Sequence, residues 1–305
     1  MRLDDEAESV NIEDRRGLSM GRGVAGGGLG VVVVALVALL LGVDPSALLR
    51  GLQGEPPGAA TAPQYAPGPP PGAPPRSGAD DEMKHFVARV LGSTETTWTE
   101  LFARQNREYV QPKLVLFSGA VESACGMAQA AVGPFYCSAD QKVYIDLSFY
   151  RDLRTRFHAP GEFAEAYVIA HEVGHHVQNQ LGIMARAHER ERGASRAQAN
   201  AISVRLELQA DCLAGVWASQ ANRERHILEP GDMEDGLNAA SQIGDDRLQM
   251  RAQGYVSPES FTHGTSAQRV QWFRTGLESG NPGRCNTFAR PSPAEAPGPR
   301  PPSGG

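Results

Sequence analysis

Residues 167–182, YVIAHEVGHHVQNQLG, place three imidazoles and a carboxylate at the centre of an otherwise apolar segment. His171 and His175 are four residues apart, so on a helix they share one face and both imidazoles can reach one metal ion. Glu172 then points beside that ion, where it can take a proton from a bound water. This HExxH spacing predicts a zinc hydrolase. The alternative is a set of satisfied polar residues on a half-exposed helix.

The helix that would carry these groups can be read from its apolar residues. Ala170, Val173 and Leu181 recur at helical spacing, and Gly182 follows as a C-terminal capping residue should. The pattern predicts a helix over about residues 164–181. His176 is adjacent to a predicted ligand and must point elsewhere, so we expect a structural role for it.

A catalytic zinc ion usually has three protein ligands, so a third must come from another element. The segment SVRLELQADCLAGVWASQ, residues 203–220, predicts a second helix on which Glu207 and Asp211 share one face among apolar neighbours. We expect Glu207 to be the third ligand, and Asp211 to accept a hydrogen bond from the outer nitrogen of His171. The alternative is a solvated charged stripe that pairs with Arg205.

Thr265 and Gln268 have the spacing of a capping box, which predicts that a helix begins there. His263 precedes this helix in a loop. It could donate a hydrogen bond to the oxyanion that forms during peptide hydrolysis, or it could simply be satisfied by the backbone. Arg269 could orient a substrate carbonyl or a carboxylate of the site.

Upstream, QKVYIDLSFY (141–150) alternates apolar and polar residues and predicts a strand. An extended substrate could add beside it as a neighbouring strand, or it could be an ordinary strand of a sheet.

Composition divides the 305-residue chain into parts. Its net charge of -6 argues against nucleic acid as a partner. Residues 23–43 contain no charged residue, and as a helix they would match the roughly 30 Å hydrocarbon core of a bilayer. The alternative is a cleaved signal peptide. The expected parts are an N-terminal segment (1–22), a transmembrane helix (23–43), a Pro/Gly-rich linker (44–80), a globular domain (81–289) and a Pro-rich tail (290–305).

Arginines precede the apolar segment, so the positive-inside rule predicts a single-pass protein of the cell membrane with its N-terminus in the cytoplasm and its catalytic domain outside. An oxidising compartment would allow disulfides between Cys125 and Cys137 and between Cys212 and Cys285. Four cysteines permit three pairings, and four buried free thiols are the alternative.

Several stretches resemble the bacterial neutral zinc metallopeptidase family, the YpfJ-like proteins. They include NIEDRRG, QPKLVLFSG, GPFYCSAD, YVIAHEVGHHVQ, SVRLELQADCLAGVWA and SFTHGTSAQR. HExxH followed by ExxxD is also similar to membrane-associated zincins of the gluzincin type. The resemblance implies that His171, His175 and Glu207 bind Zn²⁺ and that Glu172 is the general base.

The combined expectation is an α+β fold: a mostly helical zincin-like metallopeptidase domain with a small sheet, preceded by one transmembrane helix. It would hydrolyse peptides or proteins with a zinc-activated water. Two alternatives stay open. One is an anchored extracytoplasmic adaptor with a non-catalytic zinc site, and the other is a zinc hydrolase of non-peptide amides. The sequence does not indicate an oligomeric state.

Overall fold

The computed structural model describes residues 1–17, 78–130 and 133–289. The predicted transmembrane helix 23–43, nearly all of the predicted linker and the tail 290–305 lie outside these residues. Among the described residues, no helix is both long and apolar enough to cross a bilayer. Residues 1–15 belong to the same compact unit as the chain from residue 76 onward.

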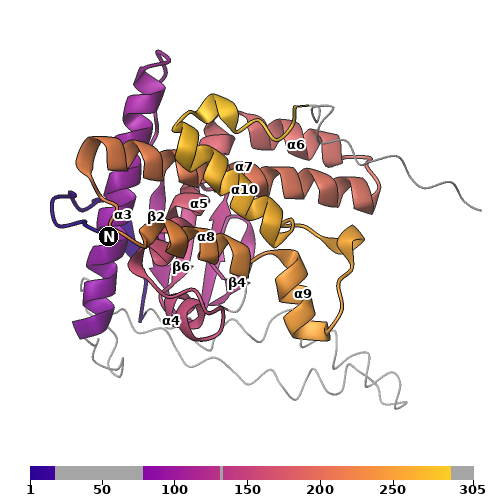
Figure 1. Ribbon diagram of the computed structural model, residues 1–305, viewed down its shortest axis with the longest axis horizontal. Helices are drawn as coiled ribbons and strands as arrows, with labels where there is room; N and C mark the ends of the chain where they lie inside the picture. The colour runs from indigo at the N-terminus through magenta and orange to yellow at the C-terminus, as the bar shows by residue number, and fades with distance from the viewer. Residues whose placement is uncertain (18–77, 131–132, 290–305) are drawn as a thin grey trace, which may run out of the picture. The chain divides into compact units, whose positions relative to one another are not determined.

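The described part is mostly helical with a small sheet, as the sequence predicts (Figure 1). The helices are α3 (Gly78–Ala103), α4 (Ser148–Thr155), α5 (Glu162–Gln180), α6 (Ile183–Glu191), α7 (Arg196–Arg225), α8 (Asp232–Gln242), α9 (Asp245–Gln253) and α10 (Ser266–Ser279), with short 3-10 turns η2 (Pro258–Ser260) and η3 (Pro282–Arg284). The strands are β1 (Ile12–Asp14), β2 (Lys113–Phe117), β3 (Ala120–Ser123), β4 (Gly126–Gln129), β5 (Phe135–Cys137) and β6 (Lys142–Asp146).

The main sheet has the strand order β1-β2-β6-β5, and β3 and β4 form a separate hairpin. β1, β2 and β6 run parallel, whereas β5 is antiparallel to β6. The strand predicted within residues 141–150 is therefore β6, and it lies between two partners. Its interpretation as the strand beside which a substrate adds is wrong, because β2 and β5 already use both of its edges. β5 is the outer strand at this end of the described sheet.

Residues 114–117 of β2 are buried on both faces, which explains why LVLF is an uninterrupted apolar run. Leu114 and Leu116 face the main core, which also contains residues of α3, α5, α7 and α10. Val115 and Phe117 face a smaller core that includes Val121 of the hairpin. Figure 1 shows α5 among the other helices near the sheet, so the predicted metal-binding helix lies at the centre of the main core.

The ends of the important helices follow the sequence signals. Thr265 and Gln268 form the predicted capping box at the start of α10, and Ser195 and Gln198 form another at the start of α7. Helix α5 ends at Gln180, and Gly182 adopts the left-handed conformation (φ 67°) that favours glycine after a helix.

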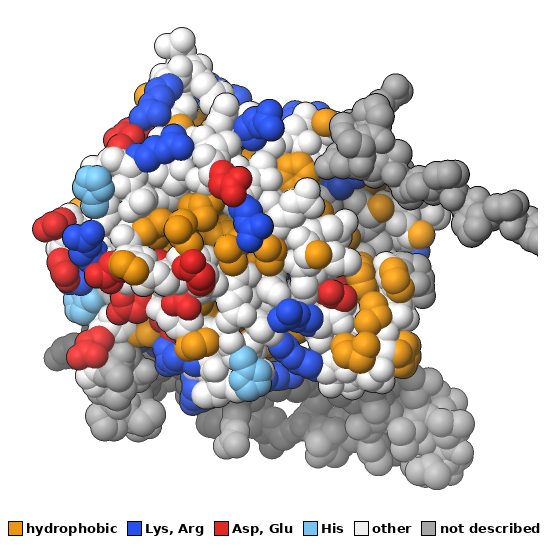
Figure 2. Space-filling view, in the orientation of Figure 1, with side chains coloured by type: hydrophobic (Ala, Val, Ile, Leu, Met, Phe, Trp, Pro, Cys, Tyr) orange, Lys and Arg blue, Asp and Glu red, His pale blue; other side chains and the backbone are white. Residues whose placement is uncertain are grey.

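The surface is mixed in character. Figure 2 shows acidic, basic and hydrophobic side chains interspersed on one face of the protein.

Candidate metal centre

Helix α5 presents His171 and His175 on one face, as their spacing predicts, and both side chains are buried. Glu207 reaches them from α7. Its two carboxylate oxygens lie 3.1 Å from His171 Nε2 and 3.3 Å from His175 Nε2. One ligand atom from each residue can be chosen so that all three lie within 4.8 Å of one another. The three residues predicted as metal ligands are therefore brought together at one point.

The two helices can approach because of a small residue between the two histidines. A Cβ added to Gly174 would lie only 3.0 Å from the backbone oxygen of Ala210 and 3.3 Å from its Cβ. A larger side chain at residue 174 would push α7 away from α5. Gly174 therefore sets the separation at which Glu207 of α7 reaches the histidines.

The outer nitrogen of His171 is held by a charged network. His171 Nδ1 donates to Asp211 Oδ1 at 2.8 Å, which is the contact expected for Asp211 from the sequence. Arg269 donates to both oxygens of the same carboxylate, Nε to Oδ2 at 2.9 Å and Nη2 to Oδ1 at 2.8 Å. The hydroxyl of Tyr167 also donates to it. Arg269 thus orients a carboxylate of the site, and at 2 % exposure it is buried with it.

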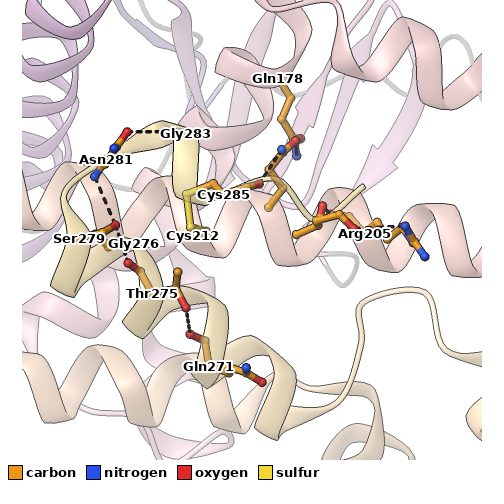
Figure 3. Close-up of a disulfide and its surroundings, with 12 residues drawn as sticks. Gln178, Arg205, Cys212, Gln271, Thr275, Gly276, Ser279, Asn281, Gly283 and Cys285 are labelled. Atoms are coloured by element: carbon orange, nitrogen blue, oxygen red, sulfur yellow. Dashed lines mark hydrogen bonds between the residues drawn. A yellow bond between two sulfur atoms is a disulfide. The ribbon is translucent and has the colours of Figure 1, made fainter. Parts of the chain in front are cut away.

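The outer nitrogen of His175 is held by neutral groups that the sequence analysis missed. His175 Nδ1 lies 2.9 Å from Gln178 Oε1. Gln178 Nε2 donates to Leu206 O at 2.7 Å and to Gln209 Oε1 at 3.1 Å, and Gln209 Nε2 donates to Cys285 O at 2.7 Å. Figure 3 shows this region, where the disulfide joins Cys285 to α7.

Both disulfides have the predicted pairing, Cys125–Cys137 and Cys212–Cys285. All four cysteines lie in the described residues, and none is free. The second bond fixes the C-terminal residues of the described chain beside the helix that carries Glu207. The first joins β5 to the turn between β3 and β4.

These hydrogen bonds define which imidazole nitrogens are free to bind a metal ion. Asp211 and Gln178 accept from the Nδ1 atoms, so Nδ1 carries the proton in each neutral ring. The two Nε2 lone pairs are then left facing Glu207, which is the state in which an imidazole binds a metal. The donor set of two imidazoles and one carboxylate is one that zinc takes in catalytic sites. The residues present therefore fit a zinc ion.

The electrostatics also favour a cation at this point. Burial acts to lower the pKa of His171, but the carboxylates of Asp211 and Glu207 outweigh it and raise this pKa to about 10. Burial acts to raise the pKa of Asp211, but Arg269 and His171 outweigh it and lower this pKa to about 2. Both carboxylates are thus ionised, and they stabilise positive charge between the imidazoles.

A cavity of about 520 Å³ opens onto this centre. His171, His175, Glu207 and Glu172 all line it. Glu172 is buried, and this burial raises the pKa of its carboxyl group despite the nearby histidines. A carboxylate with a raised pKa beside a metal-binding point is suited to accept a proton. Aromatic and aliphatic side chains from several elements complete the wall: Phe135, Phe149, Phe157, Val168, Met184, Leu206, Ile243 and Leu248.

His263 lines the same cavity from the loop before α10, and its side chain is 51 % exposed. Its Nδ1 lies 3.2 Å from Asp245 Oδ1, and its backbone N–H also donates to that carboxylate. The bond to Asp245 raises the pKa of the imidazole. The structure therefore brings His263 to the site but adds a carboxylate that the sequence analysis did not identify.

His176 points away from the metal-binding centre. Its Nε2 lies 2.7 Å from Val110 O and its Nδ1 lies 3.0 Å from the hydroxyl of Tyr136. These contacts join α5 to the strand region, which is the structural role predicted for this residue.

Known proteins are similar in sequence to much or nearly all of this chain. A family model described as "Putative neutral zinc metallopeptidase" matches residues 1–288. The protein YpfJ of Escherichia coli K12, itself uncharacterised, is 45% identical over 299 residues, which cover 95% of this chain and 99% of YpfJ. An uncharacterised protein of Mycobacterium bovis, Mb2605, is 43% identical over 228 residues, covering 70% of this chain and 74% of the relative. No solved structure matches. The chain belongs to the neutral zinc metallopeptidase family.

Proposed function

We propose that this protein is a zinc-dependent metallopeptidase that hydrolyses peptide bonds. One observation carries the proposal. His171, His175 and Glu207 converge at the wall of a cavity, with Glu172 beside them and not among the converging ligand atoms. When bound, a zinc ion supplies a water whose pKa is lowered towards about 7.

The chain's own residues account for the remaining steps. Glu172 takes the proton from the attacking water and passes it to the leaving amine. His263, which lines the same cavity, donates a hydrogen bond to the oxyanion of the substrate. Asp211 and Gln178 hold the two imidazoles in the orientation and tautomer that binding requires.

The position of strand β5 supports a peptide as the substrate. β5 pairs with β6 on one side only among the described strands, and its residues Phe135 and Tyr136 line the cavity. An extended peptide that pairs with this edge would be held by main-chain hydrogen bonds, whatever its side chains. Its scissile bond would then lie near Glu172.

The adaptor alternative predicts a closed zinc site. Structural zinc ions usually have four protein ligands. Within residues 1–17, 78–130 and 133–289, the group that could hold a metal has three members. This leaves one position for water, which favours catalysis over a purely structural role.

The decisive experiment compares the full-length wild type with Glu172→Gln. We expect each to bind about one zinc per chain, and only the wild type to cleave an unbiased peptide library. A wild type that binds zinc but cleaves no peptide would favour the adaptor or a hydrolase of other amides. Full activity in Glu172→Gln would contradict the role of Glu172.

A second pair of variants tests the third ligand. Glu207→Ala should lower zinc affinity by about 100-fold or more, because it removes one of the three side chains proposed to bind the ion directly. Glu189→Ala changes an exposed glutamate of α6 and should leave the affinity unchanged. Equal affinities in these two variants would exclude Glu207 as a ligand.

Attachment to a bilayer through residues 23–43 stays a prediction, because those residues lie outside the described part. The gluzincin type of the site is likewise a proposal, supported by the donor set and by the bond between Asp211 and His171.

A further inference from the structure

The first fifteen residues pack against the described residues from 78 to 289, which we call the body. Strand β1 pairs in parallel with β2, with Ile12 opposite Leu114 and Asp14 opposite Leu116. The ladder is extended at its ends: Leu114 N donates to Asn11 O at 2.9 Å, and Arg15 N donates to Leu116 O at 2.8 Å. β1 therefore covers the edge of a strand that is otherwise fully buried.

Side chains that precede β1 also pack against the body or form hydrogen bonds with it. Leu3 is buried in the main core. The buried carboxylate of Glu95 on α3 accepts hydrogen bonds from Ser9 Oγ and Asn11 Nδ2, both at 2.8 Å. Arg225 at the end of α7 donates to Glu6 at 2.7 Å. Apolar, polar and charged contacts thus all join the same two parts of the chain.

One glycine of α3 is explained by this contact. A Cβ added to Gly92 would lie 2.2 Å from the backbone oxygen of Ala7. Glycine is unfavourable inside a helix relative to alanine. Its presence here is consistent with a helix surface shaped to receive residues 7–9. The match of the family pattern also begins at residue 1.

If residues 1–15 lay elsewhere, the side of β2 that pairs with β1 would be an unpaired edge of the sheet. After Lys113 the sequence of β2, LVLF, is apolar and includes strand-forming residues, and an exposed edge of that kind is prone to pair with other chains. The segment before α3 is therefore needed to complete the sheet.

We propose that residues 1–15 and residues 78–289 occupy the same side of any membrane to which the protein is attached. A single crossing by the apolar residues 23–43 would place them on opposite sides and separate β1 from β2. This proposal replaces the expectation of a cytoplasmic N-terminus with an extracytoplasmic catalytic domain. The connecting residues 18–77 must begin and end on one side.

The test uses two variants of the full-length chain, each with one added cysteine, in intact spheroplasts. Val10 is 94 % exposed and Tyr255 is 60 % exposed, so Val10→Cys and Tyr255→Cys place reactive thiols on the two parts. All native cysteines are paired, so they contribute little background. Labelling with a membrane-impermeant maleimide is measured before and after permeabilisation.

We expect the two thiols to behave alike. Labelling of both before permeabilisation would place both outside, which the two disulfides favour, and protection of both would place both inside. Either result supports the proposal. Labelling of one thiol in intact spheroplasts while the other reacts only after permeabilisation would overturn it.

A stability measurement tests the contact itself. Asn11→Leu removes the hydrogen bonds from Asn11 Nδ2 to Glu95 and to Gln111, and should lower the melting temperature of the full-length protein by about 4 °C. Val10→Cys, at the adjacent exposed residue, is the matched control and should melt like the wild type. Equal melting temperatures in the two variants would count against docking of this segment.

Discussion

The two histidines of the metal centre are supported from behind by different chemistry. His171 donates to a carboxylate that Arg269 and Tyr167 also hold. His175 donates to the neutral side-chain amide of Gln178, which is followed by a second amide and a backbone carbonyl. We call these the charged arm and the amide arm.

The difference shows that both imidazoles of one site can be held in place although buried charges support only one of them. In the charged arm each ionic group is buried with its partner, so loss of either partner leaves an uncompensated charge. In the amide arm each loss leaves only a neutral group without a partner, which costs about 1–3 kcal/mol. The charged arm should therefore be the more sensitive of the two.

The largest effect is expected for Asp211→Ala. This change leaves Arg269 buried without its counter-ion and His171 without its acceptor. The free energy of unfolding should fall by about 3–5 kcal/mol, and zinc affinity should fall by about 100-fold. Urea denaturation and chelator competition measure the two effects. A loss of stability below about 1 kcal/mol would remove the basis for distinguishing the arms.

Arg269→Gln should come next. It leaves Asp211 buried without a full positive charge beside it, so stability should fall by about 3 kcal/mol. Zinc affinity should fall by only about 10-fold, because His171 keeps its acceptor. Arg274→Gln, at an exposed residue of α10, is the control and should change neither quantity. A larger loss of zinc affinity than in Asp211→Ala would show that Arg269 acts on the metal by another route.

Within the amide arm, Gln178→Ala should have the greater effect. His175 loses its acceptor and Leu206 O loses its donor, so zinc affinity should fall by about 10-fold and stability by about 1–2 kcal/mol. Gln180→Ala is the control, since Gln180 on the same helix bonds to Val110 and His176 instead. If Gln178→Ala binds zinc like the wild type, the amide does not orient His175.

The smallest effect is expected for Gln209→Ala, which removes a group one step further from the metal. Zinc affinity should fall by about threefold, as the loss of one neutral hydrogen bond implies. Gln220→Ala removes a similar bond on the same helix, from the amide to Gly280 O, and should leave affinity unchanged. Titration of both variants against one chelator distinguishes them. Identical zinc affinities in these two variants would show that Gln209 does not help to orient His175.

Sequence reasoning could identify the three predicted ligands and Asp211 because their signals are local and unusual. His171, His175, Glu207 and Asp211 stand at four-residue spacings within two helices, and carboxylates among apolar neighbours stand out. The capping residues Thr265 and Gln268 were identifiable for the same reason, since their roles depend on residues three apart.

The amide arm and strand β1 could not be predicted in this way. Glutamine carries no charge, so Gln178 looks like an ordinary polar residue, although its position three after His175 placed it on the same face. β1 is short, and its partner β2 follows more than 90 residues later. A pairing of that kind depends on tertiary structure and leaves no local periodicity.

The amide arm ends on Cys285, which lies far downstream of the predicted ligands in the sequence. The ligands themselves lie between residues 171 and 207 and are synthesised much earlier. The last acceptor that orients His175 exists only after the ribosome has passed residue 285, and it is fixed only once Cys212 and Cys285 have been oxidised. A nascent chain thus contains the predicted metal-binding residues before it contains the carbonyl that completes their frame, so we expect the site to be fully aligned only after residue 285 has been synthesised.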